Sequence, residues 1–197
     1  RRLAVLVHVG CVDPDDLGGE AVLGPGLRGA GLGTEAEAVG VGLEGVGIAD
    51  RAYQQSLAFA QERKQGRAVG KKGDGLDPII VHPDVKRMLL QARSATEGLR
   101  ALAAWTTLNS SIARSSRPEA ESAALLEDLM TPIIKSFGTD MGFEAANLGM
   151  QCYGGHGYIR DNGVEQFVRD SRINQVYEGA NGVLLAGHVR VCDGVNI

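Results

Sequence analysis

Apolar residues recur every three to four positions along most of the chain after residue 43, which is the period of amphipathic α-helices. The first such pattern ends near Gly66 and has one apolar face, formed by Ala49, Ala52, Tyr53, Ser56, Leu57 and Ala60. The second begins at Pro83, since proline is tolerated at the start of a helix, where its missing N–H would have no partner. Its apolar stripe extends from Val85 to Thr106 and predicts a second long helix.

A third helical pattern follows, with an apolar face made of Leu125, Leu126, Leu129, Met130, Ile133, Ile134 and Phe137. Ser116 and Glu119 have the spacing of a capping box at its start. Pro132 lies inside the pattern and should kink the helix, because it removes one backbone hydrogen bond. Three amphipathic helices need a further partner to cover their stripes, and residues 180–191 could supply it. The pattern therefore predicts an all-α fold, an antiparallel four-helix bundle.

The first part of the chain differs in composition, because 12 of the 28 glycines lie in residues 1–47 without a sustained helical pattern. The segment Gly24-Pro-Gly-Leu-Arg-Gly29 matches the dinucleotide-binding fingerprint, but no convincing strand precedes it and no helix opens at it. An irregular segment is therefore the favoured interpretation. We divide the chain into an irregular glycine-rich segment (1–42), a helical domain (43–190) and a tail (191–197).

Charge and composition exclude several classes of function. The net charge of −4 and an aromatic content of 5% argue against a nucleic-acid-binding surface. The cysteines, Cys11, Cys152 and Cys192, are too scattered for a disulfide framework or a zinc site, and they fit a reducing compartment. No apolar run has the length of a membrane span. We expect a cytoplasmic protein without a metal site, a nucleic-acid partner or a membrane span.

Two stretches near the C-terminus are candidates for chemistry. The segment Gly154-Gly-His-Gly157 exposes backbone N–H groups that suit a phosphate, although a helix C-cap is the favoured interpretation of the glycines alone. Glu165, Arg169, Asp170 and Arg172 lie on a short predicted helix, for which a solvated charged face is favoured. Within it, Glu165 and Arg169 have the spacing of a helical i,i+4 ion pair.

Glu178 stands between Tyr177 and the small-residue segment Gly179-Ala-Asn-Gly182. A carboxylate flanked by small residues is accessible to a substrate and can act as a general base, which the removal of a proton alpha to a thioester requires. The alternative is an exposed glutamate that favours the dipole of a following helix. The residues alone leave both interpretations open.

Several motifs taken together resemble one protein family. They are Ala58-Phe-Ala-Gln-Glu-Arg-Lys-Gln-Gly-Arg67, Ile79-Ile-Val-His-Pro-Asp-Val-Lys-Arg-Met88, Gln151-Cys-Tyr-Gly-Gly-His-Gly-Tyr158 and Tyr177-Glu-Gly179. As a set they resemble the C-terminal helical half of acyl-CoA dehydrogenases, from Leu43 to about Leu184. The likeness is strongest to the larger bacterial subgroup that includes 3-methylmercaptopropionyl-CoA dehydrogenases.

The resemblance implies an activity and its catalytic residue. The reaction would be FAD-dependent alpha,beta-dehydrogenation of an acyl-CoA thioester, with Glu178 as the catalytic base and hydride transfer to the flavin. Tyr177 and Gly179 would flank the base and shape the slot for the acyl chain. A homodimer or tetramer, and an electron-transfer flavoprotein or similar acceptor, are the partners implied.

The resemblance also implies a cofactor site with two parts. Arg63 and Gln65 correspond to family residues that contact the phosphates and the adenosine half of FAD. Gln151, Gly154 and Gly155 correspond to a loop that holds the same cofactor across a subunit interface. We therefore expect a cofactor site that two subunits share.

The chain departs from the family pattern in several places. Gln65 runs directly into Gly66, where the family usually has an aromatic residue, and Ala180 replaces a usual threonine. Residues 1–40 show no convincing match to the family's middle β-domain, and the tail after Leu184 also differs. We therefore predict that this chain is a partial copy, in which residues 1–42 are a remnant of the middle domain or disordered.

Two alternatives to a catalytic domain stay open at this point. One is a helical remnant that folds but catalyses nothing. The other is a DNA-associated flavoprotein of the alkylation-response branch, which shares the scaffold. The acidic balance argues against DNA binding, which draws its affinity from contacts between cations and phosphates.

Overall fold

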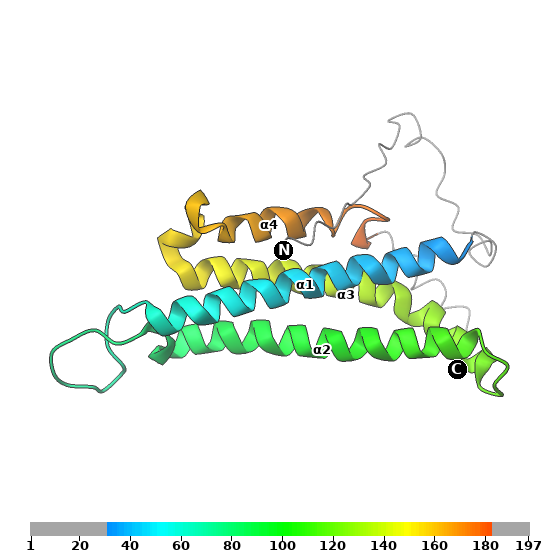
Figure 1. Cartoon of the computed structure of the whole chain (residues 1–197), viewed down its shortest axis with the longest axis horizontal. Helices are drawn as coiled ribbons and strands as arrows, with labels where there is room; N and C mark the ends of the chain where they lie inside the picture. The colour runs from blue at the N-terminus through cyan, green and yellow to red at the C-terminus, as the bar shows by residue number, and fades with distance from the viewer. Residues whose placement is uncertain (1–30, 183–197) are drawn as a thin grey trace, which may run out of the picture. The chain divides into compact units, whose positions relative to one another are not determined.

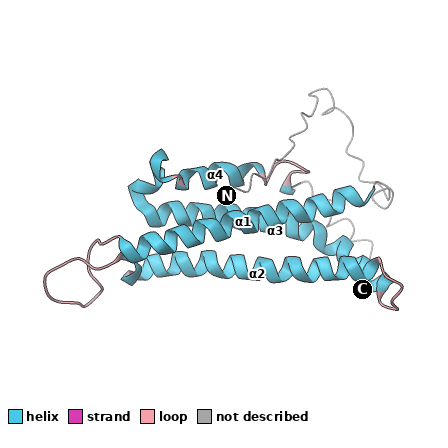
Figure 2. Ribbon diagram, in the orientation of Figure 1, coloured by secondary structure: helices cyan, strands magenta, loops and turns pink. Residues whose placement is uncertain are grey.

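The computed structural model describes residues 31–182, and this part of the chain is helical (Figure 1). Four α-helices form in the described range: α1 (Gly31–Glu62), α2 (Pro83–Ala113), α3 (Ala120–Tyr153) and α4 (Val164–Ile173). The short 3-10 helices η3 (Ile79–Val81), η4 (Gly154–Tyr158) and η5 (Arg160–Asn162) lie between them. Figure 2 shows helices and loops but no strand in this range, so the all-α prediction is confirmed.

The third helix is the central element of the bundle. α3 packs against α2, and α4 lies along another side of α3 (Figure 1). The helix is continuous through Pro132, and the predicted kink at this proline stays a prediction.

The first helix begins earlier than its sequence pattern indicated. α1 starts at Gly31, so residues 31–42, which we predicted to be irregular, form a helix. The remainder of that segment, with the fingerprint-like Gly24–Gly29 motif, lies outside the described residues, as does the tail 191–197. The expected division of the chain at residue 42 therefore cuts through a continuous helix.

Close packing explains why a glycine-rich segment is helical. A Cβ atom on Gly42 would lie 2.7 Å from the backbone oxygen of Ile134, and one on Gly45 would lie 2.3 Å from that of Gly138. A Cβ on Gly142 would in turn lie 2.7 Å from the backbone of Gly45. The absence of side chains lets α1 and α3 approach closely, so tertiary contact offsets the low helix propensity of glycine.

The same close approach changes which face of α3 is buried. Three members of the predicted apolar face are exposed: Leu125 (61%), Leu129 (38%) and Phe137 (49%). The buried face is instead made mostly of small and polar residues, among them Ala123, Thr131, Ser136, Thr139, Ala145 and Ala146. The prediction was wrong for these large residues, because a surface that packs against glycines has no room for them.

The connection between α2 and α3 also differs from the prediction. α2 begins at Pro83 as expected, but the capping box is wrong, because Glu119 precedes α3 without a side-chain capping hydrogen bond. The turn is held instead by Glu127, whose carboxylate accepts hydrogen bonds from the Ser110 hydroxyl (2.6 Å) and the Arg114 guanidinium (3.0 Å). This buried acid joins α2 and α3 at the end remote from Gly154.

The largest apolar cluster lies at the other end of the helices. Its buried members come from α1, η3, α2 and α3: Ala60, Ile79, Met88, Leu89 and Cys152. Tyr53, Leu57 and Phe59 pack against it from the first helix. The Phe59 ring stacks on Tyr153 with 4.0 Å between ring centroids, which joins the ends of α1 and α3.

α4 packs along α3. The predicted fourth partner, residues 180–191, lies mostly outside the described residues, so it stays a prediction. The sequence predicted the short charged helix α4, but not its packing against α3. Asp170 accepts a hydrogen bond from Gln166 (2.6 Å), and one carboxylate oxygen of Glu165 is buried without a partner among the described residues. Glu165 is therefore not part of a fully solvated face, whereas Asp170 and Arg172 are exposed.

Candidate active site

The segment that follows α4 holds Glu178 in an unusual backbone conformation. Glu178 has φ of 50°, and among the described residues it is the only non-glycine with positive φ. The next residue, Gly179, also has positive φ, at 86°. This left-handed conformation is unfavourable for most side chains and persists where surrounding contacts impose it, which is common at functional sites. The Glu178 side chain is exposed.

A buried lysine supplies the first of these contacts. Lys135 lies on α3 and is fully buried. Its Nζ donates to the backbone oxygen of Gly179 (2.6 Å) and to Oδ1 of Asn181 (2.9 Å). Burial lowers the pKa of Lys135, while the negative charges of Asp140 and Glu178 act in the opposite direction.

The amide of Asn181 fixes the same segment from its own side. Its Nδ2 donates to Oδ1 of Asp140 (2.8 Å) and also lies within 3.0 Å of Oγ1 of Thr139. Gln175 Nε2 donates to the same Asp140 oxygen at 2.7 Å. We call residues 175–181 the Glu178 loop. Contacts to α3 hold it on both sides of Glu178.

Tyr177 ties the loop to a second helix. Its hydroxyl donates to Oε2 of Glu44 on α1 at 2.6 Å. The pKa of Tyr177 is raised, first by burial, then by this hydrogen bond and by the charges of Glu44 and Glu178. The hydroxyl therefore stays protonated and is directed to α1, so Tyr177 would shape an acyl slot only through its ring. Gly179 contributes a carbonyl to Lys135, which the sequence had not indicated.

The predicted cofactor residues lie at the C-terminal end of α3, away from the middle of the helix on which the Glu178 loop rests. Arg63 and Gln65 follow the end of α1, and Gln151, Gly154 and Gly155 surround the end of α3. The Phe59–Tyr153 stack brings the two groups to the same end of the bundle. All five residues are exposed and accessible to a ligand.

In the glycine turn (Gly154–Gly157), neither the backbone conformation nor close packing requires a glycine at position 155. Gly154 ends α3 with φ of 59°, which confirms the C-cap interpretation. Gly157 is buried, and a Cβ there would lie 2.4 Å from the oxygen of Met150. Gly155 has no positive φ, and a Cβ added to it would meet no atom of the described residues within 4 Å. The open space above Gly155 fits the close approach of a phosphate group.

The structure separates the base from the cofactor residues within one chain. The Glu178 loop rests on α3 between Lys135 and Asp140, whereas the cofactor residues gather near Tyr153. At about 1.5 Å per residue, the helix between Lys135 and Tyr153 is about 27 Å long. The two predicted groups are therefore not neighbours in a single chain.

The residues that hold the loop were not among the site residues predicted from the sequence: Glu44, Lys135, Asp140, Thr139 and Gln175. Lys135 carried a readable signal, because it is a charged residue within the apolar run from Ile133 to Phe137. Lysine is almost never fully buried unless it has partners. A lysine at such a position is therefore expected to form hydrogen bonds with buried groups, as Lys135 does.

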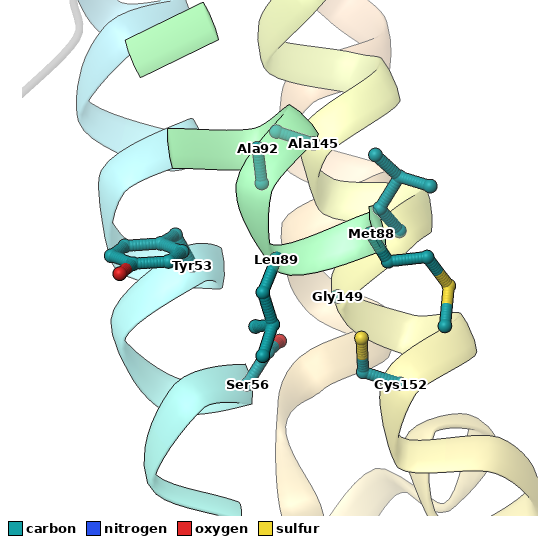
Figure 3. Close-up of a pocket in the computed structure, with 9 residues that line it drawn as sticks. Tyr53, Ser56, Met88, Leu89, Ala92, Ala145, Gly149 and Cys152 are labelled. Atoms are coloured by element: carbon teal, nitrogen blue, oxygen red, sulfur yellow. The ribbon is translucent and has the colours of Figure 1, made fainter. Parts of the chain in front are cut away.

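The pocket that the side chains line between α1, α2 and α3 is not a ligand site. Figure 3 shows it between Tyr53, Ser56, Leu89, Gly149 and Cys152, and it has no room even for a water molecule. Burial raises the pKa of the Cys152 thiol to about 11, so this thiol is not activated as a nucleophile. Across residues 31–182, no group of side chains has the composition of a metal site, and no helix is long and apolar enough to span a membrane.

Residues 24–190 match the family described as "Acyl-CoA dehydrogenase, C-terminal domain". The chain belongs to the acyl-CoA dehydrogenase family. The match begins upstream of residue 43, in agreement with the early start of α1, and extends past Leu184. The enzymes of this family are FAD-dependent oxidoreductases that act on CH–CH groups.

Two curated relatives show how much of such an enzyme this chain represents. It is 45% identical over 147 residues to 3-methylmercaptopropionyl-CoA dehydrogenase of Ruegeria pomeroyi, covering 73% of this chain and 24% of the relative. It is 30% identical over 149 residues to the broad-specificity linear acyl-CoA dehydrogenase FadE5 of Mycobacterium tuberculosis, with the same coverage. The chain thus spans about a quarter of the length of these relatives.

Solved structures share the fold. Butyryl-CoA dehydrogenase from Megasphaera elsdenii superposes with a TM-score of 0.64 and 22% identity, covering 81% of this chain and 36% of that one. Nitroalkane oxidase, in complex with the competitive inhibitor spermine, superposes with a TM-score of 0.65 and 21% identity, covering 80% and 34%. At these identities the likeness establishes the helical fold alone.

Proposed function

We propose that this chain supplies the catalytic base, Glu178, for alpha,beta-dehydrogenation of an acyl-CoA thioester. The observation that carries the proposal is the conformation of the Glu178 loop. Glu178 has an exposed carboxylate and a left-handed backbone, and contacts to α3 and α1 hold the loop in that conformation. A general base must meet its proton at hydrogen-bond distance, and a fixed loop favours that geometry.

The chemistry assigned to this chain is a proton transfer. The Glu178 carboxylate takes the proton alpha to the thioester carbonyl and becomes a neutral carboxylic acid. The loop backbone, held by Lys135 and Asn181, keeps the carboxylate in place as its charge changes. FAD, when bound, supplies the acceptor for the beta hydride.

We propose that Arg63, Gln65, Gln151, Gly154 and Gly155 bind FAD. The exposed Arg63 guanidinium suits a phosphate, and the space above Gly155 admits one closely. The length of α3 between these residues and the Glu178 loop supports a site completed by a second subunit.

The exposed apolar residues support this oligomer. α2 exposes Leu90, Trp105 and Leu108, and α3 exposes Leu125 and Phe137. Large exposed apolar side chains of this kind commonly mark interaction surfaces. We propose a homodimer or tetramer, in which part of this surface is covered by other copies of the chain or by further domains.

The proposed substrate is an acyl-CoA, and the proposed electron acceptor is an electron-transfer flavoprotein or a similar protein. The names of the relatives, which include 3-methylmercaptopropionyl-CoA and linear acyl-CoA dehydrogenases, support the substrate class. A cytoplasmic location fits the same class of enzyme.

The second candidate function is a helical domain that does not catalyse the reaction by itself. The separation of base and cofactor residues favours it. A titration of FAD into the purified chain separates the two, because cofactor residues that lie far from the base in one chain should by themselves bind FAD only weakly. A yellow protein with submicromolar affinity would exclude a helical remnant that binds nothing.

The test of the catalytic proposal is the bleaching of bound flavin by a saturated acyl-CoA in a stopped-flow instrument. Glu178→Gln keeps the size of the side chain but removes the base, so flavin reduction should slow by about 100- to 10,000-fold. Asp161→Asn is the matched control, since Asp161 is an exposed acid beside the glycine turn and should leave the rate unchanged. Reduction at the wild-type rate in Glu178→Gln would reject Glu178 as the base.

A further inference from the structure

We propose that Lys135 is the positioning residue of the catalytic base: it holds the Glu178 loop in the conformation that presents the Glu178 carboxylate. This inference rests on the proposed function of Glu178. Lys135 touches neither substrate nor cofactor in this assignment and acts only through the loop.

The burial of Lys135 is the first observation. A fully buried ammonium group is costly unless hydrogen bonds replace the water it loses. Lys135 lies in the middle of α3, where its neighbours on the helix, Ile134 and Ser136, are buried as well. The hydrogen-bond partners of the ammonium group therefore have to account for the burial of Lys135.

Those groups belong to the Glu178 loop. Nζ donates to the oxygen of Gly179 and to Oδ1 of Asn181, which lie 44 and 46 residues further along the chain. Gly179 directly follows Glu178, the residue with the left-handed backbone. A bond to the Gly179 carbonyl orients the peptide that follows Glu178, and thereby the conformation from which its side chain leaves the loop.

The charge of Lys135 adds to the geometry. Two acids lie near Lys135. One is Asp140, which accepts hydrogen bonds from Gln175 and Asn181, and the other is Glu178 itself. Attraction between the lysine and these two carboxylates favours the observed conformation of the Glu178 loop and counteracts the desolvation of the ammonium group. A neutral side chain of the same length would fill the space but provide neither the attraction nor the donors.

The first test measures the loop without any ligand. Hydrogen exchange is followed for the backbone amides of Val176, Tyr177 and Asn181, which donate to carbonyls of Ile173 and Gln175. Lys135→Met should increase their exchange by about tenfold or more, because hydrogen bonds from a charged donor are strong. Lys135→Gln, which lacks the charge and the full length of lysine but stays polar, should have the same effect and decides the question if Lys135→Met does not fold.

The control is Glu127→Gln. Glu127 is also a buried charged residue on α3, but it bonds to Ser110 and Arg114 and not to the loop. It should lower stability while leaving exchange in the Glu178 loop unchanged. Unchanged loop exchange in Lys135→Met, or in Lys135→Gln if Lys135→Met does not fold, would overturn the proposal.

The second test separates positioning from a general structural role. In the FAD-loaded protein, Lys135→Met should lower the rate constant of flavin reduction by about 100-fold, the effect of a small misplacement, with the dissociation constant of acyl-CoA unchanged. In a Glu178→Gln background the same substitution should cause no further loss, because the residue through which it acts is already inactive. An additive loss in the double variant would overturn the positioning role. If Glu178→Gln alone reduces flavin normally, the proposed function fails, while the exchange experiment still decides whether Lys135 holds the loop.

Discussion

The stretch of α3 from Lys135, in the middle of the helix, to Tyr153, at its C-terminal end, is stabilised differently at its two ends. Near Tyr153 the helices close around apolar side chains, among them Met88, Leu89 and Cys152. Near Lys135 the contacts are hydrogen bonds between buried polar groups and the Glu178 loop. Apolar burial is non-directional, so it stabilises the bundle without selecting one loop geometry. A satisfied polar network is directional and specifies a single arrangement.

This difference assigns separate tasks to the two ends. The apolar end holds a buried apolar cluster and presents exposed residues, such as Arg63 and Gly155, at its rim. The polar end fixes one short loop and the carboxylate that it carries. Substitutions at the apolar end should therefore affect stability, whereas substitutions at the polar end should affect the loop.

The largest expected effect comes from the apolar end. Leu89→Ala removes a buried side chain and leaves a cavity, so the free energy of unfolding should fall by about 2–5 kcal/mol. Urea unfolding measures this change. Hydrogen exchange of Val176 and Tyr177 under native conditions should stay at the wild-type rate. Faster exchange in this loop, under conditions where the variant is folded, would show that the two ends are not independent.

The next largest effect concerns the contact that brings α1 to α3 beside the polar end. Gly45→Ala places a Cβ 2.3 Å from the backbone oxygen of Gly138, so the helices must separate, at a cost of about 1–3 kcal/mol. Gly98→Ala is the control, since Gly98 lies inside α2 with no atom of the described residues near its Cβ position, and should stabilise by about 0.5–1 kcal/mol. Equal urea midpoints for the two variants would contradict the close contact.

Alkaline pH should affect the two ends in a defined order. The pKa of Cys152 is raised from 9.0 to about 11, and that of Tyr177 is raised from 10.0. In both cases the folded state holds its proton more tightly, so its stabilising contribution is complete below the unfolded pKa and is lost as pH rises toward the folded pKa. Stability should therefore begin to fall above about pH 9 through Cys152 and above about pH 10 through Tyr177.

Substitutions assign each part of this pH dependence. Cys152→Ala should remove the loss of stability that begins near pH 9, and Tyr177→Phe should remove the loss that begins near pH 10. Each loss begins at about the unfolded pKa of the group. At neutral pH, Tyr177→Phe should cost only about 1 kcal/mol, the value of one hydrogen bond to Glu44. Urea unfolding at a series of pH values checks both variants. An unchanged pH dependence in both would contradict the burial of these groups.

The sequence predicted those elements that depend on local patterns. Periodicity placed the long helices, Pro83 marked the start of α2, and Gly154 marked the end of α3. The family motifs supplied Glu178 and the cofactor residues as candidates, and the family itself is confirmed. The individual roles of these residues stay predictions.

The rest depended on contacts between distant parts of the chain. The glycines of α1 looked irregular because their helix is stabilised by Gly138 and Gly142, which lie far along the sequence. The buried face of α3 was misassigned for the same reason. The role of Lys135 requires a loop 44 residues away, and no local pattern encodes that contact.

The most direct test of the central claim is the exchange of the alpha hydrogen of a bound acyl-CoA with deuterium oxide. The FAD-loaded protein is incubated with a saturated acyl-CoA, and NMR follows deuterium at the alpha carbon, which reports proton removal by the base itself. We predict that wild-type protein exchanges this hydrogen and that Glu178→Gln does so more slowly by about 100-fold or more. Exchange at the wild-type rate in Glu178→Gln would show that another group removes the proton and that the Glu178 loop is not the catalytic element.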